Sequence, residues 1–132
     1  MIKGRCHCGR VAFESAGKLI RYANCHCDDC RKVSGAVFSS ALVMASDGFR
    51  ITEGEDQLSA YESSPGKFRC FCKHCSAPIV TRFNARPEIV ILRAGVLDQD
   101  DGHQPQIHIW VSAKVPWVKI CDDLPQFPEM PK

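Results

Sequence analysis

The sequence of 132 residues lacks any long apolar run and any excess of charge of one sign. No stretch approaches the ~20 apolar residues that cross a membrane, and the first residues contain no apolar segment typical of a secretory signal. The 17 Lys and Arg residues are interspersed with 15 Asp and Glu residues, so the formal net charge is only +2 and no basic arm for nucleic acid is present. We therefore expect a cytoplasmic protein with neither a membrane nor a nucleic-acid partner.

The chain is long enough for one domain and too short for two comfortable ones. We expect a single domain over residues 1–124. Residues 125–132 contain three prolines, which favour an extended and loosely held C-terminal tail.

Short strands with turn signals between them dominate the pattern, which predicts a mainly β fold. The apolar run 89–92 is typical of a central strand that is buried on both faces. One helical turn is expected at 28–33, capped by Asp28 and stopped at Ser34-Gly35. A turn is expected at Pro65-Gly66, and a solvated turn at Asp98, Asp100 and Asp101, which lack the full spacing of a calcium loop. Further strands are expected at 11–14, 19–24, 37–44, 49–52 and 107–111.

Eight of the nine cysteines lie in three clusters, CHC at 6–8, CHCDDC at 25–30 and CFCKHC at 70–75. In extended backbone, residues i and i+2 face the same way, and a C-x-x-C turn bends two thiolates onto one ion. This spacing in a short chain predicts zinc. A disulfide framework fits poorly with a reducing compartment and an odd number of cysteines, and a redox C-x-x-C would need a βαβ setting that is absent.

The spacing leaves two arrangements open. Either all eight clustered cysteines form two closed four-cysteine sites, or one closed site stands beside a three-cysteine site with a vacancy. The first arrangement is structural, whereas the second leaves a zinc position at which a substrate thiol can bind as thiolate.

The ordered motifs GRCHCG (4–9), CHCDDCRKVSG (25–35), PGKFRCFCKHC (65–75), GVLD (95–98) and HIW to PW (108–117) resemble the glutathione-dependent formaldehyde-activating enzyme family, which includes centromere protein V. The resemblance covers roughly residues 3–124. It implies a β-tent fold of several short, coiled antiparallel sheets. It also implies a carbon-sulfur lyase-type activity that joins formaldehyde, or a small aldehyde, to glutathione or another thiol.

The resemblance further implies the second arrangement, with two zinc ions. The ligands of a structural zinc would be Cys6, Cys8, Cys72 and Cys75. The ligands of a catalytic zinc would be Cys25, Cys27 and Cys30.

Two residues depart from the family pattern. Cys70 is an extra cysteine that either fills a core position or completes the vacant site, and we expect the core role. Ser76 stands where the family usually has glycine, so it should strain a left-handed backbone position.

Other polar residues near the clusters receive more ordinary expectations. The histidines inside the clusters, His7, His26 and His74, are expected at the surface or behind the ligands, because thiolates already suffice. Arg31 and Lys32 lie next to the expected catalytic zinc and are candidates to receive the carboxylates of glutathione. The competing functional hypothesis is a structural zinc module that binds a protein partner, with Cys70 completing a second closed site.

Overall fold

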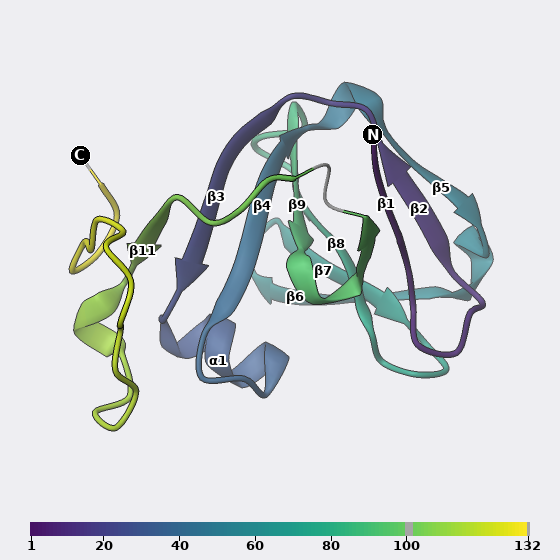
Figure 1. The fold of residues 1–132 in the computed structure, drawn as a ribbon. Coiled ribbons are helices and arrows are strands. Elements are labelled where there is room, and N and C mark those ends of the chain that lie inside the picture. Colours follow the sequence, from purple (N-terminus) through teal and green to yellow (C-terminus); the bar gives the residue numbers. More distant parts are fainter. Residues whose placement is uncertain (100–101, 132) are drawn as a thin grey trace.

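Strands dominate the computed structural model, which describes residues 1–99 and 102–131. The strands form a four-stranded sheet with the order β10-β1-β2-β5 and a seven-stranded sheet with the order β11-β3-β4-β9-β8-β7-β6 (Figure 1). The predicted mainly β class with several sheets is confirmed. Asp100 and Asp101, where part of a solvated turn is predicted, lie outside the described residues.

The strands are β1 (Ile2–Arg5), β2 (Ala12–Ser15), β3 (Leu19–Cys25), β4 (Ser39–Ala45), β5 (Phe49–Glu53), β6 (Leu58–Ser64), β7 (Lys67–Cys72), β8 (Pro78–Phe83), β9 (Ile89–Arg93), β10 (Leu97–Gln99) and β11 (Ile107–Ile109). The helix α1 spans Asp28–Ser34, and short 3-10 turns occupy Ser46–Gly48, Glu55–Gln57, Ala94–Val96 and Val111–Ala113. Among the described residues, no helix is long and apolar enough to cross a membrane.

The neighbouring strands pair antiparallel with one exception. Strand β11 runs parallel to β3 and places Ile109 opposite Cys25. A parallel neighbour needs a long connection, and most of the chain lies between these two strands. The C-terminal part of the chain is thereby brought against the strand that carries the central cysteine cluster.

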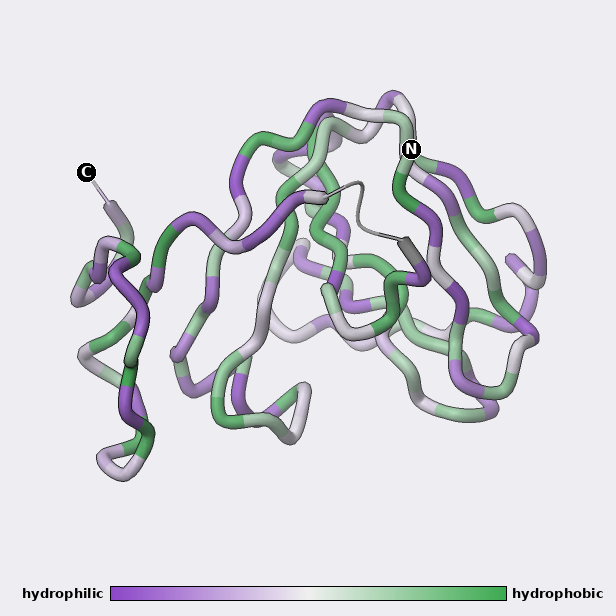
Figure 2. Tube along the Cα trace, in the orientation of Figure 1, coloured by the Kyte–Doolittle hydropathy of each residue, from purple (hydrophilic) through white to green (hydrophobic). Residues whose placement is uncertain are grey.

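The main core lies between the two sheets. Its fully buried members include Phe13 on β2, Leu42 and Met44 on β4, and Leu92 on β9. Figure 2 shows apolar positions recurring along these strands with hydrophilic positions interleaved. Strand β9 lies between β4 and β8, so the prediction of a buried central strand at 89–92 is confirmed.

Helix α1 has its cap one residue earlier than the sequence predicts. Its N-cap is Cys27, whose Sγ accepts a hydrogen bond from the backbone N–H of Cys30, and Asp28 instead occupies the first turn. The prediction of Asp28 as the cap is wrong, because a thiol sulfur takes the capping position that usually falls to a short polar side chain. The helix ends as predicted, with Gly35 in the left-handed conformation donating to the Arg31 carbonyl.

Two predictions near the C-terminus are wrong. Val111 does not continue strand β11, because Trp110 adopts a left-handed φ of 56° and a 3-10 turn follows. The tail is not loosely held in its described part, because its backbone is hydrogen-bonded to the segment around β11. The bonds run from His108 N to Pro125 O, from Phe127 N to His108 O and from Trp110 N to Glu129 O.

Gly54 tests the close packing of its loop against the backbone of Arg10. Its φ is +75°, and a Cβ atom there would overlap the carbonyl oxygen of Arg10, just after the first cysteine cluster. We expect Gly54→Ala to lower the free energy of unfolding by more than about 1 kcal/mol, because it adds both strain and a clash. Chemical denaturation measures this, with Gly95→Ala as the control, since a Cβ at Gly95 meets open space. Equal stability of the two variants would contradict this account.

Candidate metal centres

Two turns of the same construction present the first and the last cysteine pairs. In each turn the first cysteine N–H donates to the carbonyl five residues ahead, from Cys6 to Val11 and from Cys72 to Ala77. Each turn also contains a left-handed residue, Gly9 with φ 86° and Ser76 with φ 68°. The predicted left-handed conformation of Ser76 is confirmed. These turns aim backbone N–H groups inward, as a C-x-C or C-x-x-C pair around one ion requires.

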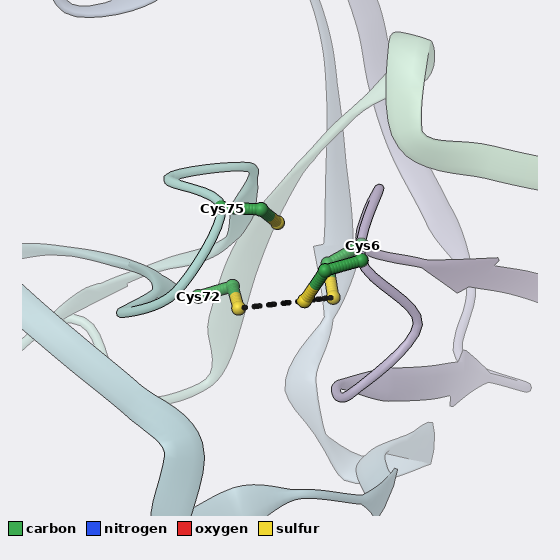
Figure 3. Close-up of side chains that lie close together, drawn as sticks. Cys6, Cys72 and Cys75 are labelled. Carbon is green, nitrogen blue, oxygen red and sulfur yellow. Dashed lines mark hydrogen bonds between the residues drawn. The ribbon is translucent and has the colours of Figure 1, made fainter.

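The sulfur atoms of these two turns meet between the sheets. The Sγ atoms of the four cysteines lie within 4.8 Å of one another, and the Cys6–Cys8 and Cys8–Cys72 sulfur distances are both 3.6 Å. Figure 3 shows Cys6 on one loop pointing toward Cys72 and Cys75 on the other. Tetrahedral Zn–S bonds of ~2.3 Å place sulfurs about 3.8 Å apart, so this geometry fits a zinc ion. The members of this four-sulfur group are Cys6, Cys8, Cys72 and Cys75.

Hydrogen bonds favour the thiolate form of Cys6 and Cys8, whereas burial raises the pKa of Cys72. The backbone N–H of Val11 donates to Cys6 Sγ at 3.2 Å. A hydrogen bond from the backbone of Arg10 lowers the pKa of Cys8 to about 6. Metal ligation needs the deprotonated sulfur, and donors of this kind favour it.

The central cluster forms a separate three-sulfur group. Cys25 ends β3, Cys27 caps α1 and Cys30 lies in its first turn, and their sulfurs lie within 4.8 Å of one another. The distance between Cys25 Sγ and Cys27 Sγ is 3.3 Å. Among the described residues no fourth His, Cys, Asp or Glu ligand joins this group. A metal ion held here would keep one position open, as catalytic zinc sites do.

Positive charge surrounds the three-sulfur group. A hydrogen bond from Cys25, followed by the charge of Arg93, lowers the pKa of Cys30 to about 5. The same hydrogen bond and burial raise the pKa of Cys25. The opposite directions of these two pKa shifts make Cys30 the first of the pair to lose its proton. Arg69 contributes in the same direction as Arg93.

A cavity of about 1100 Å³ opens over the elements that carry this group, although none of the three cysteines is among its described lining residues. Its walls include Val33 and Ser34 of α1, the helix that carries Cys30, and Ser39, which pairs with Cys25 across β3 and β4. Apolar side chains such as Phe38 and Ile91 line most of it. Binding sites for small molecules are usually concave and mainly apolar with a few polar groups. The cavity therefore has the size and character to hold a substrate beside the three sulfurs.

The comparisons with known proteins decide the family. The family model described as "Glutathione-dependent formaldehyde-activating enzyme" matches residues 1–113. The chain belongs to the glutathione-dependent formaldehyde-activating enzyme family. The family that the sequence motifs resemble is thereby confirmed.

Curated relatives agree with this assignment. A protein of Halomonas elongata named "Putative glutathione-dependent formaldehyde-activating enzyme" is 27% identical over 91% of this chain and 81% of its own length. Proteins of the same name from Pyrenophora teres f. teres and Phaeosphaeria nodorum are 27% and 26% identical, and the match covers 82% of this chain and 60% of each relative. The crystal structure of a Rhodobacter sphaeroides protein superposes with a TM-score of 0.62 at 23% identity, over 78% of this chain and 97% of that one, which shows a shared fold.

Cys70, the cysteine in excess of the family pattern, joins neither sulfur group among the described residues. It is half-buried, packs against the main core and contacts the cavity. Burial raises its pKa. A thiol in this environment is a small apolar side chain rather than a metal ligand.

The histidines within the clusters have different environments. His7 and His74 are exposed, and His74 hydrogen-bonds Gln57. His26 is fully buried, and its Nε2 lies 3.0 Å from His108 Nδ1. His108 Nε2 in turn lies 2.9 Å from Asp122 Oδ2. Burial, followed by the charge of His108, lowers the pKa of His26 to about 4, so its ring is neutral at pH 7.

This chain of hydrogen bonds orients the loop of the three-sulfur group. An ionised Asp122 only accepts, so His108 donates to it through Nε2, and one proton bridges His108 Nδ1 and His26 Nε2. Sequence reasoning assigned no role to His108 or Asp122. The signals for His108 were its place in the HIW motif and its position between the apolar residues Ile107 and Ile109, which turns it to the other face of its strand.

Arg31 and Lys32 lie outside the walls of the cavity. Arg31 forms an ion pair with Asp28 and donates through Nε to the carbonyl of His26 at 3.3 Å. Lys32 is exposed on α1. Their role as receptors for substrate carboxylates stays a prediction.

Ser76 provides a test of strain in the second turn. We expect Ser76→Gly to raise the free energy of unfolding by about 1 kcal/mol, because glycine adopts a positive φ without steric cost. Ser59→Gly, at an exposed position of β6, is the matched control and should destabilise by about 0.5–1 kcal/mol. Denaturant unfolding of both variants measures the difference, and equal effects at the two positions would refute the strain.

Zinc content distinguishes the roles of the cysteines. We expect Cys6→Ser to lose one equivalent of zinc and much of its thermal stability, because a closed structural site contributes directly to folding. Cys70→Ser should retain the zinc content of the wild type, because its sulfur lies in neither group. Elemental analysis of the purified variants measures this. Loss of zinc from Cys70→Ser would reinstate the model of two closed sites.

Proposed function

We propose that this chain is a zinc-dependent enzyme of the carbon-sulfur lyase type that joins glutathione, or a related thiol, to formaldehyde or a small aldehyde. The observation that carries the proposal is the three-sulfur group with no fourth protein ligand among the described residues, beside a cavity. Membership of the family and the names of the curated relatives support glutathione and formaldehyde as the substrates.

The two sulfur groups would hold zinc ions with different roles. Cys6, Cys8, Cys72 and Cys75 would hold a structural zinc ion. Cys25, Cys27 and Cys30 would hold the catalytic one. When bound there, zinc would supply an exchangeable fourth position at which a thiol is held as thiolate.

The protein's own residues set the conditions for the reaction. Arg93 and Arg69 offset the negative charge of the cysteine thiolates, which keeps a further sulfur anion acceptable nearby. The contacts from Asp122 through His108 to His26 fix the loop between Cys25 and Cys27. The cavity brings thiol and aldehyde together and excludes water, and positioning of this kind accounts for much of the catalysis of a bimolecular addition.

The reaction itself is an addition. The thiol sulfur forms a bond to the carbonyl carbon of formaldehyde as the carbon-oxygen π bond breaks. The proton that the thiol loses ends on the new hydroxyl group, so the product is S-hydroxymethylglutathione and no oxidant is consumed. We expect the reaction to take place in the cytoplasm, where the nine cysteines stay reduced.

Exchange spectroscopy tests the activity directly. We expect the zinc-loaded wild type to accelerate the interconversion of ¹³C-formaldehyde and S-hydroxymethylglutathione above the spontaneous rate. Cys30→Ser should return the rate to the spontaneous one, because it removes one of the three sulfurs that hold the ion. Cys121→Ser, at an exposed cysteine outside both groups, is the control and should leave the rate unchanged.

Binding of thiol to the metal is tested separately. In the cobalt-substituted protein, glutathione should change the visible absorption of the metal, since sulfur enters the open position. Absence of both the spectral change and the acceleration would overturn the proposed function and leave the structural zinc module as the better explanation.

A further inference from the structure

Arg69 on β7 is a buried arginine in the wall of the cavity. Its side chain is only 8% exposed, yet its Nη1 atom has no hydrogen-bond partner among the described residues. Leaving a buried charge without a partner is strongly unfavourable, because the desolvated group loses its hydrogen bonds to water and gains none in return. A side chain of this kind is typical of a binding site for an anion.

The guanidinium group of Arg69 faces the cavity together with that of Arg93. Arg69 pairs with Thr81 of β8, and Thr81 pairs with Ile91 of β9. Because side chains directly opposite in a sheet share a face, as do residues two apart, Arg69 and Arg93 project on the same side. Both line the cavity.

Serine hydroxyls hold both arginines in place while leaving donors free. Arg69 Nε donates to Ser63 Oγ at 2.9 Å, and Arg93 Nη1 donates to Ser39 Oγ at 2.8 Å. A neutral hydroxyl orients a guanidinium group without cancelling its charge. Each arginine thus keeps N–H groups that can reach a ligand.

No protein carboxylate competes for these charges. The described residues that line the cavity include no Asp or Glu, and none of the ion pairs between described residues involves Arg69 or Arg93. The rest of the lining is mainly apolar, with side chains such as Phe71 and Val80. Ion pairs and charge-assisted hydrogen bonds strengthen where water is excluded.

The order of the charges along the cavity fits an extended thiol. Arg93 on β9 donates to Ser39, which pairs with Cys25, whereas Arg69 on β7 donates to Ser63 of the edge strand β6. Arg93 therefore lies on the side of the three-sulfur group. A thiol that reaches that group would pass Arg93, and the remainder of the molecule would extend toward Arg69.

We propose that Arg69, assisted by Arg93, forms a carboxylate-binding subsite in this cavity and selects thiols that carry a carboxylate several bonds from the sulfur. The thiol part of this statement rests on the proposed function. The subsite lies on the face of the larger sheet that lines the cavity, apart from Arg31 and Lys32 on α1. The competing explanation is that both arginines serve only the cysteine thiolates, in which case the charge of the ligand should not matter.

Binding of a capped ligand isolates the subsite from the metal chemistry. S-methylglutathione keeps both carboxylates but cannot bind zinc as a thiolate, and its dimethyl ester lacks both negative charges. We expect isothermal titration calorimetry of the zinc-loaded wild type to show binding of S-methylglutathione at least about tenfold tighter than binding of the ester, as loss of charge-assisted hydrogen bonds predicts.

Single arginine variants show which side chain recognises the carboxylates of the ligand. Arg69→Gln should weaken binding of S-methylglutathione about tenfold or more and leave binding of the ester nearly unchanged, which also shows that the variant is folded. Arg82→Gln, on the adjacent strand β8 and exposed, is the matched control and should bind both ligands as the wild type does. Arg31→Gln and Lys32→Gln test the other predicted receptors in the same assay.

Three results would overturn the subsite. These are a wild type that binds neither ligand measurably, a wild type that binds both ligands equally, and an Arg69→Gln variant that binds S-methylglutathione like the wild type. The test stands apart from that of the proposed function. Arg69-dependent binding without any acceleration of S-hydroxymethylglutathione formation would reject the activity alone. Acceleration by the wild type that is undiminished in Arg69→Gln at low glutathione would reject the subsite alone.

Discussion

The meeting of four cysteine sulfurs between two loops is the constraint on which the rest of this structure depends. One loop joins β1 to β2 in the smaller sheet, and the other joins β7 to β8 in the larger sheet. Cys6 and Cys72 are themselves buried in the core, so a metal ion bound by the four sulfurs would link the sheets at the point where their side chains pack. Binding of metal and packing of the core are therefore expected to be one event rather than two.

The second sulfur group depends on this arrangement without sharing its ligands. Its three cysteines lie at the junction of β3 and α1, and the parallel strand β11 supports that junction from the side. Strand β11 also brings His108 against His26, and the C-terminal segment supplies Asp122. His108 and Asp122, far from the cluster in sequence, thus fix the short loop that contains His26. The rigidity of that loop is what an open metal site needs for selective chemistry.

Charge is distributed unevenly although the chain as a whole is nearly neutral. The formal net charge of +2 gives no hint of a cationic site. Arg69 and Arg93 nevertheless lie on one face of the larger sheet without acidic neighbours in the cavity lining, close enough to influence Cys30. Their isolation from carboxylates, rather than their number, gives the cavity its character. The net charge does not show where individual charges lie. Only the pairing of β7, β8 and β9 brings these two arginines onto one face of the sheet.

The sequence by itself determined the chemistry that the chain has available, because ligand type and spacing are local properties. The three clusters, the central strand at 89–92 and the end of α1 at Gly35 follow from residues close together along the chain, whereas the left-handed Ser76 was expected from the family resemblance. Spacing left open which clusters meet, and the family resemblance implied the division. Only the tertiary structure brings the sulfurs together, keeps Cys70 outside both groups, and places Arg69, His108 and Asp122 near them. The physical reason is that these contacts join residues far apart in sequence. Sheet order and burial bring them together, and neither can be inferred from local spacing.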